Sequence, residues 1–504
     1  MALPLPVNID STYVDTGDSA ANGIVAHQQA HDTLHTTANN SRYSLPDYTI
    51  YFDGTNYSAR NERTSTIDST SNSSIHVPFN FATKALNNNQ QYDGAGSGFW
   101  DSYSAGGRVE IARPTSGAAL SASAPLFVYT GQAIQGPGRG AVITAASNFT
   151  DSAVASETNG FGALLSVGWG VHLSDTALRV KLYDLALDCN SKSAGILFRR
   201  NQNGNVLAPG YSGTSEFVGN EVRNFNTYGI QVGIKNVDDA SQAGSTNLWA
   251  TRNFIHGGNA GSKAFATNTG DVHIEFNNIN NDAKAGSFII WINQLTTMIR
   301  NNHCAYQAGG IVNPSANIVY NSGSGHLCLG NYIDGAGDNG QAAVEVLGGG
   351  SVEMIANHVN WHSDTATFPA AKAAFTLAAG TSYCAVVGNV VLGKPTVNGA
   401  QLISLNAASA PTTQFVGNKG RYVNGFFAGT KPVCMSGNQI NNIAGTVQSD
   451  TLITTAGLSA TQATAQGVLE ANCIQAFDGL QVMDTTNSRL WTRINGIWRF
   501  SQLT

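Results

Sequence analysis

Apolar and polar positions repeat in one pattern through the middle of the chain. Between residues 217 and 440 an apolar residue, a small or basic residue, an asparagine, a variable residue and usually another apolar residue recur in FVGNEV, ATRNFI, EFNNI, MIRNNH, CLGNYI, MIANHV, VVGNVV, FVGNKG and MSGNQI. The repeated asparagines, spaced by 20 to 33 residues, are Asn220, Asn253, Asn277, Asn301, Asn331, Asn357, Asn389, Asn418 and Asn438. Such spacings are typical of solenoid turns, and their scatter indicates constant strands joined by loops of different length. Because asparagine tolerates the left-handed backbone and can bond to stacked copies of itself, we expect each coil to turn at its asparagine.

A second pattern lies between these asparagines. A small residue, an apolar residue, a variable residue and an apolar residue recur in GILF at 195–198, GIQV at 229–232, AVEV at 343–346 and AFTL at 374–377. This alternation is typical of a strand with one face in a core and the other toward solvent, and helical periodicity is absent from the region. The sequence therefore predicts an all-β fold, a right-handed parallel β-helix in which each coil pairs with the coils above and below.

The composition agrees with this fold and argues against two classes of binding partner. The chain has 504 residues, of which 42% are hydrophobic, 12% are charged and 55 are glycine. A solenoid grows without splitting, so we expect one long core rather than several domains. The net charge of -6 without basic runs argues against nucleic acid and anionic membranes. No segment is predicted to insert in a membrane, and MALPLPVNIDSTY lacks the features of a signal peptide, so we expect no export by the secretory route.

The six cysteines are far apart and form no CxxC pair. They are Cys189, Cys304, Cys328, Cys384, Cys434 and Cys473. Most lie beside apolar residues in expected strands, which predicts free, buried thiols, with a disulfide or a metal cluster as the alternative.

The first 45 residues differ from the rest of the chain. Ile24, His27, His31 and Leu34 have the alternating three- and four-residue spacing of a short coiled-coil seam. His27, His31 and His35 also share one helical face. The segment is interpreted either as a trimer-forming or docking helix with partly solvated histidines, or as a three-histidine ring that captures a metal or an anion.

The remaining chain divides into four expected parts. Residues 46–110 form a cap, with a helix in HVPFNFATKALNN beginning near Pro78, and residues 111–445 form the β-helix. Residues 446–470 form a linker, and residues 471–504 form a small β unit with two strands around a DTTNS turn and a third strand. The GPGRG run at 136–140 lacks the lysine and the helix of a phosphate loop, which favours a simple turn.

This order of parts resembles bacteriophage tailspikes of the pectin-lyase-like class. The terminal phrase VMDTTNSRLWTRINGIWR is similar to small terminal modules of phage tail fibres, and the histidine-bearing start resembles tail-protein termini of phages that infect actinobacteria. The resemblance implies a homotrimeric virion appendage that binds a surface glycan and, in many relatives, cleaves it. None of the motifs that carry the resemblance is a catalytic signature.

Chemistry on a β-helix must come from outward strand positions and loops, because the inside is apolar. Hydrolysis of a glycan needs two carboxylates. In AVEV, Val344 and Val346 point inward and place Glu345 on the outer face, which makes Glu345 the best catalytic candidate. Asp334 and Asp338, in the loop before that strand, are the expected partners.

Aromatic and polar residues extend this candidate site. The expected substrate-binding residues are Trp291, Trp361, His358, His362, Gln231 and Glu353, with Gln231 in the slot equivalent to Glu345 in an earlier coil. The alternative is that Glu345 is a solvated strand residue and Trp361 packs under a loop.

Three further patterns are weaker indications of a metal site, a calcium or sugar site, and a lyase site. Asp271, His273 and Glu275 alternate on one strand, about 6.5–7 Å apart, too far for one metal ion without help from another coil. Loop residues Asp238, Asp239 and Asp282 are consistent with calcium or sugar binding, or with solvated turns. A lyase needs a base near a group that neutralises a uronate, and His303 near Arg300 fits that requirement.

The sequence thus predicts a trimeric virion protein that binds host polysaccharide and attaches to the phage tail or baseplate through its N-terminus. Glycoside hydrolysis is favoured over elimination, and no cofactor or metal is expected. The alternatives are a spike that binds without turnover and a free bacterial pectate-lyase-like enzyme. The missing signal peptide argues against the last.

Overall fold

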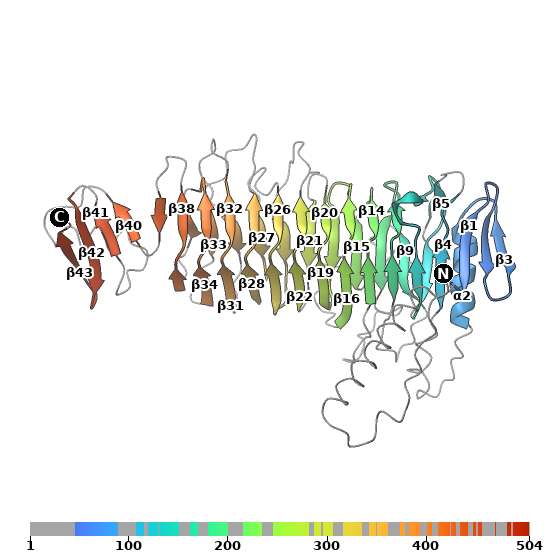
Figure 1. Ribbon diagram of the computed structural model, residues 1–504, viewed down its shortest axis with the longest axis horizontal. Coiled ribbons are helices and arrows are strands. Elements are labelled where there is room, and N and C mark those ends of the chain that lie inside the picture. Colours follow the sequence, from blue (N-terminus) through green and yellow to red (C-terminus); the bar gives the residue numbers. More distant parts are fainter. Residues whose placement is uncertain are drawn as a thin grey trace, which may run out of the picture.

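The chain folds as a right-handed parallel β-helix, which confirms the predicted fold class (Figure 1). A computed structural model describes residues 46–88, 107–114, 119–129, 131–150, 162–169, 180–199, 215–233, 245–281, 287–293, 296–305, 316–334, 342–348, 350–360, 373–378, 383–393, 401–405, 412–423, 425–429, 434–441, 447–449, 452–455, 469, 481–484 and 487–502. Within these residues three long sheets run along the molecule, and each coil contributes one strand to each sheet in turn.

Sheet A begins with an antiparallel hairpin and continues as parallel strands. In spatial order it contains β3 (Thr66–Ser71), β2 (Tyr57–Asn61), β1 (Tyr48–Phe52), β4 (Arg108–Ile111), β7 (Ala133–Gln135), β10 (Lys181–Tyr183), β13 (Ser215–Val218), β16 (Ser245–Thr251), β19 (Gly270–Glu275), β22 (Thr297–Arg300), β25 (His326–Leu329), β28 (Ser351–Ile355), β31 (Tyr383–Val387), β34 (Thr413–Val416) and β37 (Cys434–Ser436). From β13 to β37, each of these strands precedes one of the repeated asparagines.

Sheet B carries the short strands that follow the asparagines. It contains β5 (Leu120–Ala122), β8 (Val142–Ala145), β11 (Ala186–Asp188), β14 (Glu221–Arg223), β17 (Phe254–His256), β20 (Asn278–Asn280), β23 (His303–Ala305), β26 (Tyr332–Asp334), β29 (His358–Asn360), β32 (Val390–Leu392), β35 (Lys419–Arg421), β38 (Gln439–Asn441) and the antiparallel β39 (Val447–Ser449).

Sheet C is built from the second sequence pattern. It contains β6 (Leu126–Tyr129), β9 (Ala163–Trp169), β12 (Ala194–Arg199), β15 (Tyr228–Gly233), β18 (Lys263–Thr267), β21 (Phe288–Ile292), β24 (Ala316–Tyr320), β27 (Ala342–Val346), β30 (Ala373–Leu377), β33 (Gln401–Leu405) and β36 (Gly425–Gly429). The small residue of the pattern has a steric cause, since a Cβ added to Gly229 would lie 2.5 Å from the carbonyl oxygen of Ala264 in the next coil.

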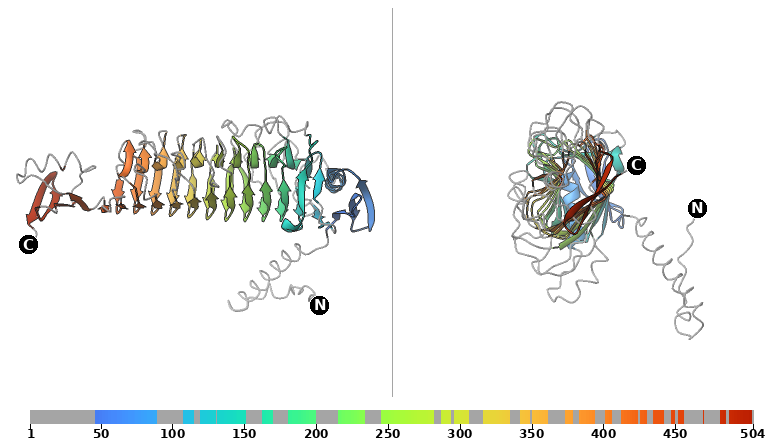
Figure 2. Two further views of the ribbon diagram at one scale, coloured as in Figure 1. Left: turned by 90° about the horizontal axis from the view of Figure 1, so that it is seen from above. Right: turned by 90° about the vertical axis from the view of Figure 1, so that its left-hand side faces the viewer.

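The coils stack along one axis (Figure 2), and one apolar core runs along their inside. From β8 to β38 every sheet B strand except β35 places at least one apolar side chain in it, as Ile279 and Ile333 do, and both are fully buried; β35 has Gly420 at this position. At one end, helix α2 (His76–Asn88) places Phe79, Ala82 and Leu86 in this core. The helix expected near Pro78 is therefore present, and it covers core residues that the first coil would otherwise expose to water.

The asparagines form a continuous ladder, but one rung differs from the prediction. In each pair the side-chain Nδ2 of one asparagine donates to Oδ1 of the next at 2.9 to 3.0 Å, from Asn220 to Asn438. Asn302 supplies the fourth rung, whereas Asn301, which the sequence pattern selected, is exposed beside it. Because Asn301 and Asn302 are adjacent, the sequence pattern alone does not show which of them is the rung.

The left-handed corner residue also differs from the prediction. The residue directly before each ladder asparagine has a positive φ, as in Gly330 and Asn301, whereas the ladder asparagines do not. The asparagine is needed for its buried amide, because that amide bonds both the next rung and a backbone carbonyl of an earlier strand. The prediction that each coil turns at its asparagine is thus wrong by one residue.

The C-terminal residues form a separate small sheet of β40 (Leu452–Thr455), β41 (Gln481–Asp484), β42 (Arg489–Ile494) and β43 (Ile497–Gln502). The last three are the strands expected around the DTTNS turn and at Trp498. Strand β40 lies within 446–470, the range expected to be a linker, and pairs with β41. The expected boundary at 110 falls inside β4, which pairs with β7 of the coils.

Other local predictions concern the cysteines and the glycine-rich run. Cys189, Cys304, Cys328 and Cys384 are free and buried, as predicted, while the side chains of Cys434 and Cys473 lie outside the described residues. Burial raises the pKa of the Cys328 thiol to about 12, so it stays protonated. The GPGRG run is a turn that includes a short 3-10 helix, Gly138–Gly140. The histidine-bearing segment before residue 46 is outside the described residues.

None of the helices described here is long and apolar enough to cross a membrane.

Candidate functional site

The outer face of sheet C carries one column of side chains that runs along the molecule. Strand register aligns Leu197, Gln231, Ala266, Trp291, Val319, Glu345, Thr376 and Ser404. Three residues singled out from the sequence, Gln231, Trp291 and Glu345, therefore share this column. At about 4.8 Å per strand, Trp291 lies roughly 10 Å from Glu345 along the column, and Gln231 roughly 19 Å.

Glu345 is held in place by its strand. Val344 and Val346 on either side are buried in the core, which fixes the backbone and directs the Glu345 side chain outward, where it is partly exposed. It is the only carboxylate on the sheet C strands that the structure describes. A second acid at this site would have to come from outside these strands.

Gln231 and Trp291 present polar atoms that have no partner among the described residues. Gln231 is 1% exposed, and neither its amide oxygen nor its amide nitrogen makes a hydrogen bond. The indole Nε1 of Trp291 is likewise buried and unpaired. Leaving such groups unsatisfied costs about 1–3 kcal/mol each.

Lys263 adds a positive charge to the same face. Its ammonium lies 4.5 Å from the ring centroid of Trp291, 5.8 Å from that of Tyr228 and 5.9 Å from that of Phe288. The rings of Phe288 and Trp291 meet edge to face, with centroids 4.7 Å apart. The cation–π contacts fix the indole and place a cation beside it.

The other predicted site residues lie elsewhere. Asp334 and His358 are on the outer face of sheet B, and Glu353 is on that of sheet A, so the strands do not bring them beside Glu345. The expectation that Asp334 and Glu353 share a patch with Glu345 overlooked that consecutive strands of one coil belong to different sheets. Asp338, Trp361 and His362 lie outside the described residues, as do Asp238, Asp239 and Asp282.

Sheet B carries its own row of polar and aromatic side chains. The rings of Tyr332 and His358 stack with centroids 5.0 Å apart, and His303 lies 5.4 Å from Tyr332 on the other side. Asn360 donates to the Tyr332 hydroxyl at 3.2 Å, and Asp334 is the register neighbour of Asn360. Tyr332 and His358 are stacked, so each covers one face of the other, whereas the His303 ring is tilted by 56° against Tyr332.

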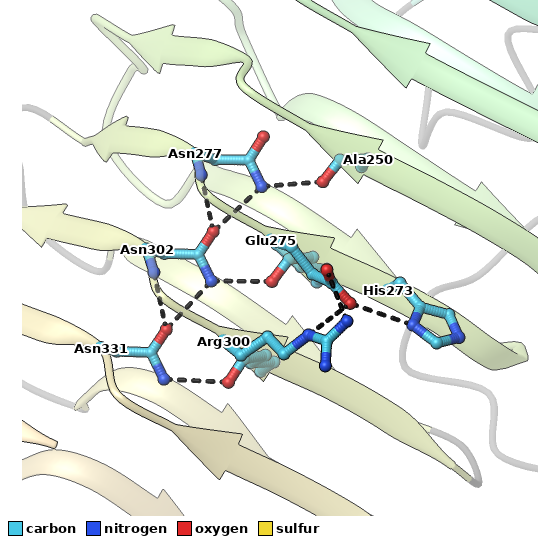
Figure 3. A network of polar contacts seen from close by, with 9 residues as sticks. Ala250, His273, Glu275, Asn277, Arg300, Asn302 and Asn331 are labelled. Carbon is cyan, nitrogen blue, oxygen red and sulfur yellow. Dashed lines mark hydrogen bonds and ion pairs between the residues drawn. The ribbon is translucent and has the colours of Figure 1, made fainter. Parts of the chain in front are cut away.

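Sheet A carries a buried ion pair (Figure 3). The Glu275 side chain is 3% exposed, with Arg300 Nε 2.8 Å from its Oε1, and Arg300 Nη2 donates to its Oε2 at 2.9 Å. His273 Nδ1 lies 3.1 Å from the same Oε1, and its ring stacks on Trp249 at 3.9 Å between centroids. Arg300 is thus engaged on sheet A while His303 lies on sheet B, so the strands separate the pair considered for a lyase.

The structure gives no support for a metal at the alternating acidic strand. Among the described residues, no group of three His, Cys, Asp or Glu side chains converges as metal ligands. Asp271 is partly exposed at the start of β19, and Glu275 is bound to Arg300.

The sequence analysis identified Trp291 but missed Lys263 and the two other rings beside it, Tyr228 and Phe288. The segment AFAT at 264–267 fits the second pattern, and aligning it with GIQV would have placed Lys263 in the slot of Tyr228, directly beside the Gln231 column. The alternation in AFAT is weak because two of its four residues are alanine.

Comparisons with known proteins find matches only among solved structures, at low sequence identity. No family model matches the sequence, and no curated protein matches it. Among solved structures, the A-module of a mannuronan C-5 epimerase from Azotobacter vinelandii is 16% identical over 73% of this chain and 95% of its own, with a TM-score of 0.41. A mutant tailspike protein of Escherichia coli bacteriophage HK620, in complex with a pentasaccharide, is 12% identical over 76% of this chain and 66% of its own, with a TM-score of 0.45. Tailspike protein 3 of bacteriophage CBA120 is 11% identical over 96% of this chain and 76% of its own, with a TM-score of 0.33.

Proposed function

We propose that this chain is a phage tailspike that binds a host surface polysaccharide along sheet C and hydrolyses it with Glu345. The observation that carries the proposal is the sheet C column, in which Gln231, Trp291 and Glu345 share one outward register. Gln231, Trp291 and Glu345 lie in every second coil, so neighbouring members of the column are roughly 10 Å apart, a spacing that suits contacts at intervals along a linear polymer. The partly exposed Trp291 ring offers a face to sugar C–H groups, and Lys263 stiffens that aromatic contact.

The proposed role of Glu345 is general acid or base. Its backbone is fixed by two buried valines, which suits a group that must hold one position relative to a glycosidic bond. Hydrolysis needs a second carboxylate, at about 5–5.5 Å for retention or 6.5–9.5 Å for inversion. Asp338, which precedes β27 in the sequence, remains the proposed partner.

The first test is turnover on host capsule or cell-wall glycan. New reducing ends without absorbance from an unsaturated product would support hydrolysis, whereas unsaturated product would indicate a lyase. Glu345→Gln should lower turnover by about 10²- to 10⁴-fold while glycan binding is kept. The matched control is Glu353→Gln, the same change at an exposed site on sheet A, which should leave turnover unaltered. Full turnover in Glu345→Gln would remove this residue from the mechanism.

A spike that binds without turnover is the second candidate. It is favoured by one observation, that the described sheet C strands carry no carboxylate other than Glu345. Binding of the polymer without any product after prolonged incubation would establish it.

We also propose that three chains assemble and attach to the phage tail through residues 1–45. Sheet A supports assembly, since Leu329, Ile355, Val387 and Val416 hold the same outward position in four successive coils and are partly exposed. A continuous aliphatic strip on a flat sheet favours association with copies of itself.

A further inference from the structure

The corner between sheets A and B carries three large side chains where most coils carry glycine. The corner position is the residue directly before each ladder asparagine. Along the chain it is occupied by Gly219, Arg252, Phe276, Asn301, Gly330, Ala356, Gly388, Gly417 and Gly437, all with positive φ. Arg252, Phe276 and Asn301 occupy it in three successive coils.

These three residues adopt a backbone conformation that disfavours their side chains. Their φ values are 58°, 55° and 55°, in the left-handed region that glycine enters freely and that asparagine tolerates. A phenylalanine there is an outlier, and such strain persists only where the surrounding structure imposes it. Because five other coils make the same turn with glycine, the turn does not require the large side chains.

The three side chains point to solvent and are available to a ligand. Phe276 is 56% exposed, and its ring contacts no other aromatic ring among the described residues. Arg252 is exposed, and within the described part of the chain no carboxylate pairs with it. Asn301 is exposed, and its Oδ1 lies 2.6 Å from where a Cβ on Gly330 would stand, so its amide lies over that glycine.

Backbone hydrogen bonds anchor the corner row, by which we mean Arg252, Phe276 and Asn301. The Arg252 N–H donates to the Glu275 carbonyl at 3.3 Å, and the Phe276 N–H donates to the Arg300 carbonyl at 3.1 Å. Glu275 and Arg300 form the buried ion pair of sheet A, and the ladder asparagines follow directly. The backbone of these residues is therefore already ordered, so ligand binding has only their side chains left to order.

The charge of the corner row favours binding of an anionic ligand. Among the residues that the structure describes, no carboxylate pairs with Arg252, and Glu275 beside it is already occupied by Arg300 and His273. The nearest outward positions on sheet B are Phe254, Asn278 and His303, none of which is acidic.

We propose that Arg252, Phe276 and Asn301 form a subsite for a carboxylate-bearing sugar unit. Arg252 pairs with the carboxylate, the Phe276 ring packs against the C–H face of the sugar, and the Asn301 amide bonds a hydroxyl. With coils about 4.8 Å apart, the three side chains span roughly 10 Å, enough for one sugar ring and its substituents. The inference rests on the proposed function only in taking a glycan as the ligand.

Saturation-transfer NMR with glucuronate and with glucose as probes tests this subsite. Glucuronate should receive saturation on its ring C–H protons, and Phe276→Gly should abolish that transfer. Arg252→Gln should weaken glucuronate about tenfold, to the level of glucose, because a hydrogen bond to a charged group is lost. Equal binding of both sugars by the unchanged protein would overturn the proposal.

Stability separates a binding role from a structural one. Phe276→Gly installs the residue that other coils use, so its melting temperature should stay the same or rise while binding is lost. Ala356→Gly, at the same corner three coils from Phe276, relieves the same strain and should leave glucuronate binding intact. A fall in melting temperature with unchanged glucuronate transfer in Phe276→Gly would assign the residue to folding instead. Glu345→Gln should keep the glucuronate signal, so failure at the corner and failure at Glu345 are distinguishable.

Discussion

At the scale of single residues, the ladder amides are the strongest determinants of the coil. Asn302 Oδ1 accepts from the backbone and side chain of Asn277, while Asn302 Nδ2 donates to Asn331 Oδ1 and to the Ile274 carbonyl. Asn302→Ala leaves several buried groups unpaired, and we expect it to lower the free energy of unfolding by roughly 3 kcal/mol. Asn301→Gly, one residue away and exposed, should cost nothing in the same urea titration. Equal losses in both variants would contradict the rung assignment.

A second residue-scale prediction concerns His326. Burial lowers its pKa from 6.5 to about 4, its ring is 2% exposed, and its Nε2 donates to the Ser322 carbonyl at 3.2 Å. The folded protein keeps this ring neutral, whereas the unfolded chain protonates it below about pH 6.5. Stability is therefore complete above pH 6.5 and should fall by roughly 3 kcal/mol as the pH drops to about 4. Measured unfolding free energies should show this slope, and His326→Gln should flatten it. A slope that persists in the variant would assign the effect to other groups.

At the scale of strands, the buried ion pair between β19 and β22 gives a third prediction. Arg300→Met leaves the Glu275 carboxylate buried with His273 as its remaining polar partner, and we expect a loss of about 3–5 kcal/mol. The double variant Glu275→Leu with Arg300→Met removes both charges and should recover most of that stability. Chemical denaturation of the two variants measures the difference. If the double variant is as unstable as the single one, packing rather than charge holds these strands.

Strands also show what the sequence could and could not predict. The asparagine pattern and the alternation in AVEV predicted the coils, the ladder and the outward direction of Glu345, because each depends on side-chain periodicity within one strand. Assigning Asp334 or Glu353 to a sheet depends instead on how far the intervening loop turns the chain, which local periodicity does not encode. The rung error at Asn301 has the same origin, since only the backbone angle distinguishes two adjacent asparagines. The proposed corner subsite has no signature in the sequence, because arginine and phenylalanine rarely adopt the positive φ that Arg252 and Phe276 have here.

At the scale of the whole molecule, the proposed glycan binding, anion binding and assembly use three different surfaces of the β-helix. Sheet C presents Gln231, Trp291 and Glu345 to a polymer, while the corner between sheets A and B presents Arg252 and Phe276. The aliphatic strip on sheet A then remains as the face for assembly. A rod built this way binds along its length, and the loops of different length between coils alter specificity without disturbing the core.

Assembly through sheet A gives the last prediction. Val387 lies in the centre of the strip, between Ile355 and Val416 in the strand register, so a charge there must be desolvated if copies pack on this face. We expect Val387→Asp to shift the native mass from three chains toward one while the circular dichroism spectrum stays that of the parent, because the side chain points away from the core. Asn278→Asp, an exposed substitution of the same charge on sheet B, should leave three chains together. If Val387→Asp remains trimeric, sheet A faces solvent in the assembly and the contact must lie on another surface or in the N-terminal segment.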